Sequence, residues 1–227
     1  MSALKKFIVW DWNGTLLNDT DAVMASNNMI LEKIGRAPIS AELFRDCFIH
    51  PTRDFYAAIG LSEEELTKVM VMERDAFHDA YEELALTMPL HLGATEILDA
   101  LREHNVASLI VSNHITGEIV RILKQRNIDH HFDEVIAYIS RGKQFRDMTK
   151  GEKLQEYIKA NGLNGTNALI VGDTMEEIEI ARALGMISVS ITGGVHAEHR
   201  LRAKSPDHVI HSLHELKPIL QERGFIS

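Results

Sequence analysis

Two aspartates, Asp11 and Asp173, occur where the sequence could build a metal site. Asp11 directly follows the apolar run Phe7–Trp10, and Asp173 comes shortly after the apolar run Asn167–Val171. Glu177 would add a third carboxylate four residues further on. Carboxylate oxygens are the ligands that Mg²⁺ prefers in proteins. If the two runs are neighbouring strands, their ends could hold one Mg²⁺ ion.

A hydroxyl group and a positive charge accompany these acids. Ser112 follows the apolar run Val106–Val111, and Lys150 opens a helical pattern. A metal ion and a lysine neutralise the charge on phosphoryl oxygens, a hydroxyl donates a hydrogen bond to them, and a carboxylate can attack phosphorus. The combination therefore indicates a site that handles a phosphoryl group.

Each of these residues, taken alone, also has a purely structural explanation. Asp11 fits a turn, Ser112 fits a helix cap, and Lys150 fits an exposed surface charge. Glu177 lies three residues after Thr174, which is the spacing of a capping box and accounts for this glutamate without any metal. Only the four features together favour chemistry.

Apolar runs that alternate with helical patterns would position these side chains. Such near-continuous runs are typical of strands covered on both faces of a parallel sheet. We expect strands at Phe7–Trp10, Val106–Val111, Asn167–Val171 and Ile187–Ile191, with weaker signals at Glu134–Ile139 and His208–His211. Helical patterns lie between them at Ala94–His104, Thr149–Ala160 and Met175–Leu184. The alternation predicts an α/β fold with a doubly wound parallel sheet, in which ligands bind at the carboxyl ends of the strands.

Residues 19–86 interrupt this alternation. They carry no strand signal, and four helical stretches lie near residues 20–35, 40–47, 51–59 and 62–85. We predict that residues 19–86 form a second, helical domain inserted into an α/β catalytic core made of residues 1–18 and 87–227. Thr87-Met88-Pro89 would be the return linker, because proline disfavours helix at the residue before it.

Four segments around the predicted strand ends share a pattern with known proteins. They are DWNGT at residues 11–15, VSN at 111–113, Lys150, and GDTMEE at 172–177. In this order they resemble the four motifs of the haloacid dehalogenase superfamily in its phosphatase branch. The helical insertion after the first motif is similar to the cap domain of phosphoglycolate phosphatases and β-phosphoglucomutases. The resemblance implies a Rossmann-like core with a helical cap.

The resemblance also implies a metal site and a nucleophile. Asp11 would attack phosphorus to form an aspartyl-phosphate and would also bind Mg²⁺. The backbone carbonyl of Asn13 and the carboxylate of Asp173 would complete the protein's metal contacts. Glu177 would act on the metal directly or through water, unless it only caps its helix.

Substrate contacts are implied at four further positions. Ser112 and Lys150 would hold the phosphoryl oxygens, and the backbone amide of Asn113 would add a donor. Arg53 lies in a segment similar to the part of the cap that meets substrate, where it could clamp a carboxylate or a second anionic group. An exposed arginine at a helix start is the alternative for Arg53.

Asn13 is the main departure from the family pattern. Family phosphatases have aspartate at this position, as general acid for the leaving alcohol and base for the hydrolytic water. An amide cannot exchange a proton near neutral pH, and a positioned acid or base contributes about 10²–10⁴-fold in rate. Three explanations stay open: a good leaving group such as an acyl phosphate, a proton supplied by another residue such as His114 or His196, or slow turnover.

Composition limits the partners and the location. The chain has 227 residues with 45% hydrophobic and 25% charged residues and a net charge of −9, as in ordinary globular proteins. The acidic balance opposes binding to nucleic acid and to anionic lipid. The N-terminal apolar run is too short for a signal or membrane segment, and the single cysteine, Cys47, excludes an internal disulfide. We expect a cytoplasmic protein without a nucleic-acid or membrane partner.

The preferred function is Mg²⁺-dependent hydrolysis of a small phosphorylated metabolite by a monomer or homodimer, slow or specialised because of Asn13. The alternative is a catalytically weak family member that binds a phosphorylated metabolite or protein as a sensor or scaffold.

Overall fold

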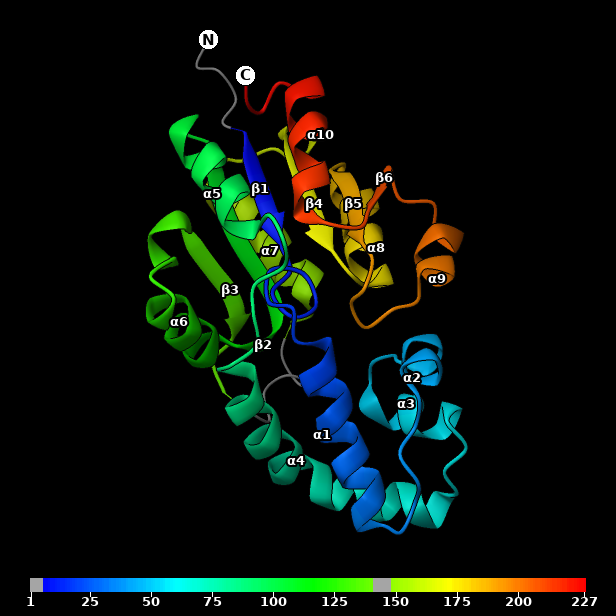
Figure 1. Cartoon of the computed structure of the whole chain (residues 1–227). Helices are drawn as coiled ribbons and strands as arrows, with labels where there is room; N and C mark the ends of the chain where they lie inside the picture. Colours follow the sequence, from blue (N-terminus) through cyan, green and yellow to red (C-terminus); the bar gives the residue numbers. More distant parts are fainter. Residues whose placement is uncertain (1–5, 141–147) are drawn as a thin grey trace.

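A six-stranded parallel sheet forms the centre of the molecule (Figure 1). The computed structural model describes residues 6–140 and 148–227, without the side chains of residues 73–75. The strand order is β3-β2-β1-β4-β5-β6. The strands are β1 (Phe7–Trp10), β2 (Ala107–Ile115), β3 (Glu134–Tyr138), β4 (Ala168–Gly172), β5 (Ile187–Ile191) and β6 (His208–Ile210). The chain winds outward from β1 in both directions, so the predicted doubly wound α/β fold is confirmed.

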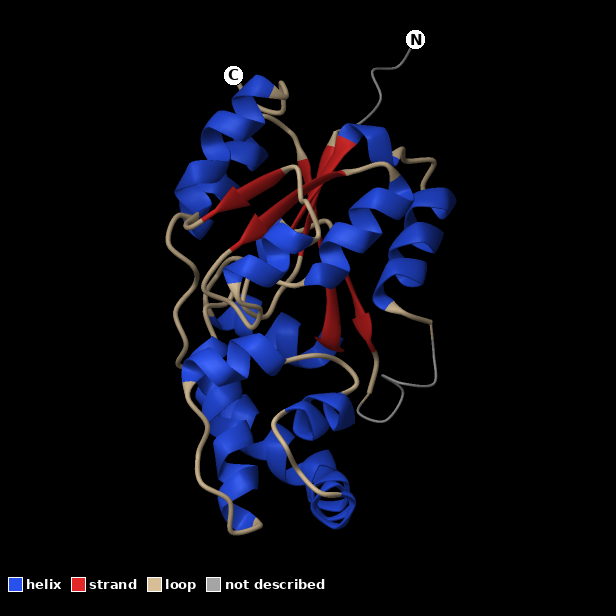
Figure 2. Ribbon diagram, turned by 90° about the vertical axis from the view of Figure 1, so that its right-hand side faces the viewer, coloured by secondary structure: helices blue, strands red, loops and turns tan. Residues whose placement is uncertain are grey.

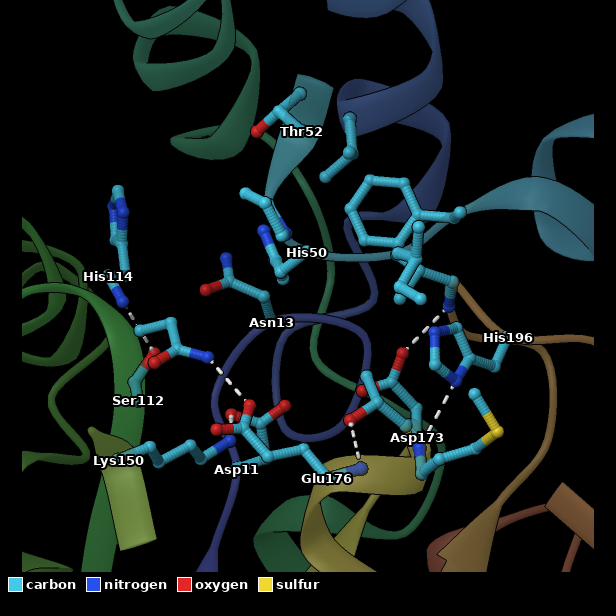
Figure 3. A pocket seen from close by; sticks show the side chains of 18 of the residues that line it. Asp11, Asn13, His50, Thr52, Ser112, His114, Lys150, Asp173, Glu176 and His196 are labelled. Atoms are coloured by element: carbon cyan, nitrogen blue, oxygen red, sulfur yellow. Dashed lines mark hydrogen bonds and ion pairs between the residues drawn. The ribbon is translucent and has the colours of Figure 1, made fainter. Parts of the chain in front are cut away.

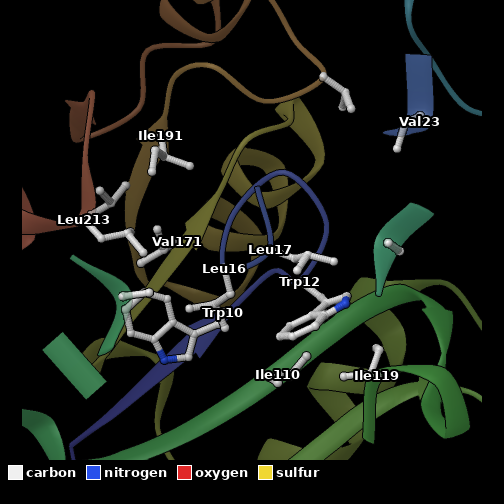
Figure 4. Packing of buried hydrophobic residues seen from close by; sticks show 14 of the residues in the cluster. Trp10, Trp12, Leu16, Leu17, Val23, Ile110, Ile119, Val171, Ile191 and Leu213 are labelled. Atoms are coloured by element: carbon white, nitrogen blue, oxygen red, sulfur yellow. The ribbon is translucent and has the colours of Figure 1, made fainter. Parts of the chain in front are cut away.

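Helices cover both faces of this sheet (Figure 2). Side chains of β1 alternate between two separate hydrophobic clusters: Ile8 and Trp10 belong to one, and Phe7 and Val9 belong to the other. The first cluster includes α5 (Ala94–Glu103), α6 (Thr116–Gln125) and α10 (Leu216–Glu222), and the second includes α7 (Lys150–Ala160) and α8 (Met175–Leu184). Figure 4 shows Trp10 packed among Leu16, Val171 and Leu213 on the first face. Burial on both faces explains why the strands have continuous apolar sequences.

The second strand differs from its prediction. The apolar run ends at Val111, but β2 continues through Ser112 and Asn113 to Ile115. Its pairing with β3 shifts register between Val111 and Ile115. An irregularity of this kind at a strand end re-aims side chains, and here it lies at residues 112–114, which face the site described below. The other predicted strands and helices are found within about two residues of their expected ends, the usual uncertainty of an element boundary.

Four inserted helices lie beyond the carboxyl ends of the strands (Figure 1). They are α1 (Thr20–Lys33), α2 (Ala41–Cys47), α3 (Thr52–Ala58) and α4 (Glu63–Ala85), and the remaining short helix, α9 (Glu198–Ala203), belongs to the sheet side. The chain enters and leaves the insertion side by side, since the amide of Asn18 donates to the carbonyl of Pro89 at 2.9 Å. None of the helices in the described ranges is long and apolar enough to cross a membrane.

The inserted helices also contact the core through arginines. The guanidinium group of Arg45 donates to the carbonyl oxygens of Gly193 and Gly194, at 3.3 and 3.0 Å. In the opposite direction, Arg200 donates to the carbonyl oxygens of Arg45 and Phe48, at 2.9 and 2.8 Å. These contacts hold the α2 end of the insertion against the loop that follows β5.

Candidate active site

A cavity of about 1140 Å³ separates the strand ends from the inserted helices. The core contributes the residues singled out from the sequence: Asp11, Asn13, Ser112, Asn113, Lys150, Asp173 and Glu177. The insertion contributes mainly aromatic, apolar and imidazole groups, among them Phe48, His50, Met70, Phe77 and Tyr81. Figure 3 shows the acidic and basic side chains gathered at the core end of this cavity. Segments far apart in the sequence therefore meet at the carboxyl ends of β1, β2 and β4.

Lys150 is buried between two of the acids. Its Nζ donates to Asp11 Oδ1 at 2.7 Å and to Glu177 Oε1 at 2.5 Å, and its side chain is only 2% exposed. Thr149 and Glu152 form a capping box that starts α7 and places Lys150 at its first residue. Burial alone would lower the pKa of Lys150, but the charges of Asp11 and Glu177 raise it above the ordinary lysine value. The surface-charge explanation for Lys150 is thereby excluded.

Asp173 lies fully buried in a narrow cradle beside Asp11. Thr15 Oγ1 donates to Asp173 Oδ1 at 3.1 Å, and the amide of Val195 donates to Asp173 Oδ2 at 2.7 Å. A Cβ atom added to Gly14 or Gly194 would lie 2.3 or 2.1 Å from Asp173 Oδ2. Only glycine leaves room for this carboxylate at both positions.

We expect Gly194→Ala to displace Asp173 and to lower turnover by about 10²-fold or more, since small misplacements at a reacting site have effects of this size. Gly194 does not have a positive φ, so the clash with Asp173 is the main effect of the added methyl group. Steady-state kinetics with a phosphate ester measures the loss. Gly193→Ala changes the same loop without a clash, because no atom lies within 4 Å of the added Cβ. Its φ of +91° imposes backbone strain instead. Unchanged turnover in Gly194→Ala would contradict the role of this cradle.

The charges of the site favour a divalent cation. Asp11, Asp173 and Glu177 are buried with a single buried ammonium group, Lys150, in the described part of the chain. Burial raises the pKa of Asp11 to about 7. Burial, and then the charge of Asp11, raise the pKa of Asp173 well above its ordinary value. Two negative charges remain unbalanced when all three acids are ionised, and a doubly charged ion would compensate them.

Within the described residues, no three His, Cys, Asp or Glu side chains form a ready metal cluster. The expected ligand set does not require one, because it uses two carboxylates, a backbone carbonyl and water. Mg²⁺ usually keeps several of its waters and takes one or two protein carboxylates. The donor set of Asp11, Asp173 and the Asn13 carbonyl therefore fits this ion.

Mg²⁺ should raise the melting temperature of the protein more at pH 8 than at pH 5. Asp11, with a raised pKa of about 7, is mainly protonated at pH 5 and ionised at pH 8, and only the ionised form binds the cation well. The same raised pKa makes ionised Asp11 destabilising without metal, so Mg²⁺ also relieves more repulsion at pH 8. Calorimetry at both pH values checks this, and equal shifts would contradict it.

Glu177 has both carboxylate oxygens occupied by the protein. Oε1 accepts from Lys150, and Oε2 accepts from the Thr174 hydroxyl at 2.6 Å and the Thr174 amide at 3.1 Å. Burial would raise the pKa of Glu177, but the charge and hydrogen bond of Lys150 lower it. These contacts favour the capping role, with Glu177 also holding Lys150 in place, over direct metal binding.

Ser112 and Asn113 lie on the β2 side of the cavity. Ser112 Oγ accepts from the amide of His114 at 3.1 Å, and its own hydroxyl hydrogen has no acceptor among the described residues. The hydroxyl is thus free to donate to a phosphoryl oxygen. The side chain of Asn113 donates to Glu176 Oε2 at 2.7 Å, which joins the end of β2 to the start of α8.

The structure does not bring Arg53 into the cavity. Its guanidinium group is ion-paired with Glu63 at 2.6 Å, its side chain is about half exposed, and it is absent from the described cavity lining. Arg53 is therefore an exposed arginine at the start of a helix, which was the alternative interpretation of this residue. Arg45, eight residues earlier, does reach the core, where it donates to the carbonyl oxygen of Gly194.

The two histidines considered as proton donors both line the cavity. His196 Nδ1 accepts from the amide of Met175 at 3.1 Å, and burial lowers the pKa of His196 to about 4. His196 is therefore neutral near pH 7 and a poor source of a proton. His114 packs its ring edge-on against Tyr81, with the centroids 5.6 Å apart.

Asn13 belongs to a hydrogen-bonded group that the sequence did not reveal. Its Nδ2 donates to Asp19 Oδ2 at 2.7 Å and to the hydroxyl of Tyr81 at 2.5 Å. Tyr81 lies on the apolar face of α4, where it is hard to tell from an ordinary core residue. A buried tyrosine needs a hydrogen-bond partner for its hydroxyl. This requirement could have indicated from the sequence that Tyr81 contacts a polar residue.

Comparison with known proteins identifies the family of this chain. The haloacid dehalogenase-like hydrolase family matches residues 8–191. The chain is 23% identical to phosphoglycolate phosphatase 1 of Pseudomonas aeruginosa, over 98% of this chain and 82% of that protein. It is 25% identical to a phosphoglycolate phosphatase of Vibrio parahaemolyticus, over 95% of this chain and 96% of that protein.

Solved structures share the fold. A haloacid dehalogenase-like family hydrolase from Streptococcus pneumoniae superimposes with a TM-score of 0.79 at 20% identity, covering 96% of this chain and 99% of that one. A predicted phosphoglycolate phosphatase from Haemophilus somnus gives a TM-score of 0.75 at 22% identity, covering 97% and 100%. The family match covers more than half of the sequence and includes all four motif segments, so this chain belongs to the haloacid dehalogenase-like hydrolase family.

Proposed function

We propose that the protein is a Mg²⁺-dependent phosphatase that hydrolyses a small phosphate monoester through an aspartyl-phosphate on Asp11. The observation that carries this proposal is the buried contact of Lys150 with Asp11 and Glu177 at the foot of a large cavity. The carboxylate of Asp11 provides a nucleophile, and the buried ammonium group of Lys150 beside it provides a charge that attracts a phosphate dianion. The names of the curated relatives support the same reaction class.

In the first step, a carboxylate oxygen of Asp11 forms a bond to phosphorus as the bond to the ester oxygen breaks. Lys150 and the Ser112 hydroxyl hold the phosphoryl oxygens, and the attraction of Lys150 opposes the protonation of Asp11 that burial favours. The leaving oxygen departs with the electron pair and takes its proton from solvent, because the amide of Asn13 cannot supply one. This step should therefore depend strongly on the leaving group.

In the second step, water attacks phosphorus and the bond to Asp11 breaks. Asp11 regains its carboxylate, and both hydrogens of the water end on the released phosphate, so that atoms and charge balance. Asp11, Asp173 and the backbone carbonyl of Asn13 would hold Mg²⁺, which would supply positive charge against the phosphoryl oxygens. Glu177 would orient Lys150.

We further propose that residues 19–86 act as a cap domain over this site. Their aromatic and apolar residues line the side of the cavity opposite Asp11, and Arg45 and Arg200 join them to the core. Such a cover excludes water during phosphoryl transfer and selects the leaving group by its shape.

The test is phosphate release from a panel of phosphate monoesters and acyl phosphates, with Mg²⁺ and after chelation. The proposal predicts release that needs Mg²⁺ and is fastest for good leaving groups. Tight binding of a phosphorylated metabolite without any release of phosphate would instead support a sensor function, which fits the replacement of the usual acid by Asn13.

A further inference from the structure

The amide nitrogen of Asn13, the Tyr81 hydroxyl and the Asp19 carboxylate form a closed hydrogen-bonded set. The Asn13 amide nitrogen lies within hydrogen-bond distance of both Asp19 Oδ2 and the Tyr81 hydroxyl, at 2.7 and 2.5 Å, and these two acceptors lie on the same side of it. The Tyr81 hydroxyl in turn donates to Asp19 Oδ2, and Asp19 Oδ1 accepts from the amide of Gly14 at 2.7 Å. The nitrogen of the Asn13 amide is therefore held on the side of Asp19 and Tyr81.

The carbonyl oxygen of Asn13 lies on the opposite side of the amide from these partners and can face the cavity. Figure 3 shows the Asn13 side chain in the space between Asp11 and the insertion residue His50. A carbonyl oxygen accepts hydrogen bonds from water but cannot donate one to the oxygen of a leaving ester. The arrangement suits the water that hydrolyses the aspartyl-phosphate.

Tyr81 is held firmly in this position. Its side chain is buried, its ring stacks on Phe77 with centroids 5.8 Å apart, and His114 of β2 packs edge-on against it. Tyr81 comes from α4, whereas Asn13 lies in the loop after β1. The orientation of Asn13 thus depends on a residue that is 68 positions away and belongs to the inserted helices.

We propose that Tyr81 is a positioning residue for the second chemical step, which rests on the proposed phosphatase function. By binding the Asn13 amide, together with Asp19, Tyr81 turns the Asn13 carbonyl oxygen toward the hydrolytic water. Asn13 accepts a hydrogen bond from this water and takes no proton. The water oxygen forms the new bond to phosphorus, the bond to Asp11 breaks, and the released phosphate keeps both hydrogens.

The test compares Tyr81→Phe with Tyr56→Phe. Tyr56 is a matched control because it is another buried tyrosine of the inserted helices, and its hydroxyl donates to Asn27 at 2.8 Å. Loss of one hydrogen bond should slow hydrolysis of the aspartyl-phosphate by about tenfold in Tyr81→Phe. Formation of the intermediate should change much less.

Rapid mixing with p-nitrophenyl phosphate separates the two steps. Tyr81→Phe should show a burst of about one equivalent of p-nitrophenol followed by a lowered steady-state rate, and Tyr56→Phe should show a burst no larger than the unmodified protein. A general loosening of the insertion would slow both steps and produce no larger burst. Equal kinetics in the two variants would overturn the proposal.

A second measurement does not depend on turnover. Hydrogen exchange of the Asn13 side-chain amide, followed by NMR in the full chain, should be at least about tenfold faster in Tyr81→Phe than in Tyr56→Phe, because one of its two acceptors is lost. Absence of phosphate release from the unmodified protein would contradict the phosphatase function. Equal exchange in the two variants would contradict the positioning role.

Discussion

Asp11→Asn should lower kcat for every substrate by at least about 10³-fold, the order of loss found when a nucleophile is removed. The amide is nearly identical in shape to the carboxylate, but it cannot attack phosphorus or carry the phosphoryl group. Lys150 keeps Glu177 as a buried partner in this variant. The comparison therefore isolates the chemistry of Asp11 from the integrity of the site.

Thermal unfolding provides the control for Asp11→Asn. The raised pKa of about 7 at Asp11 means that its ionised form is disfavoured in the folded, metal-free protein. Metal-free Asp11→Asn should accordingly unfold at the same temperature as the unmodified protein or above it at pH 8. Residual turnover within tenfold of the unmodified protein would show that another residue is the nucleophile.

Asn13→Asp should accelerate the hydrolysis of an alkyl phosphate by about 10²-fold or more, the usual contribution of a positioned general acid. p-Nitrophenyl phosphate should change by less than about tenfold, because its leaving group departs without protonation. The ratio of kcat/KM for the two substrates measures this effect. A similar change for both substrates would contradict the interpretation of Asn13 as a missing acid.

The partner of Asn13 makes this experiment sharper. Asp19 Oδ2 accepts from Asn13 at 2.7 Å, so Asn13→Asp would place a second carboxyl group against Asp19. Two carboxyl groups at this distance share a proton, which raises the apparent pKa of the pair and keeps an acid available. The double variant Asn13→Asp with Asp19→Asn restores one acid and one amide. It should shift the alkaline limb of the pH profile, where the acid loses its proton, to lower pH relative to Asn13→Asp alone.

The elements that carry the site could be predicted because local patterns specify them. Near-continuous apolar sequences identified β1 and β4, and Thr174 with Glu177 identified the start of α8 by their spacing. The predicted strand ended at Val111 because Ser112-Asn113-His114 are polar, but in the structure these residues continue β2 beside the cavity. Polarity at the end of this strand therefore indicated residues that line the cavity, but it placed the end of the strand too early.

Other properties of the site depend on contacts between distant segments. The sequence around Lys150 is that of an exposed helix start, and its burial depends on Asp11 and Glu177, which are 139 and 27 positions away. Asp19 and Tyr81 have no motif that links them to Asn13. Arg53 and Arg45 could not be told apart by sequence, because only the packing of α2 against the loop after β5 brings Arg45 to the core.

The presence of asparagine at position 13 is consistent with the residues around it. Asp19 is buried and already accepts from Tyr81 and Gly14, so an ionised aspartate at position 13 would meet a like charge there. The Asn13 amide instead donates a hydrogen bond to the Asp19 carboxylate. We interpret Asn13, Asp19 and Tyr81 as one unit that replaces proton transfer by orientation of water.

A crystal structure of the protein with Mn²⁺ in place of Mg²⁺ and a phosphate mimic such as beryllium fluoride tests the shared cation directly. We predict one anomalous peak within about 2.0–2.3 Å of oxygens from Asp11, Asp173 and the Asn13 backbone. The mimic should be attached to Asp11 and should contact Ser112 and Lys150. An ion that touches only one of the two aspartates, or a mimic bound away from Asp11, would contradict the account.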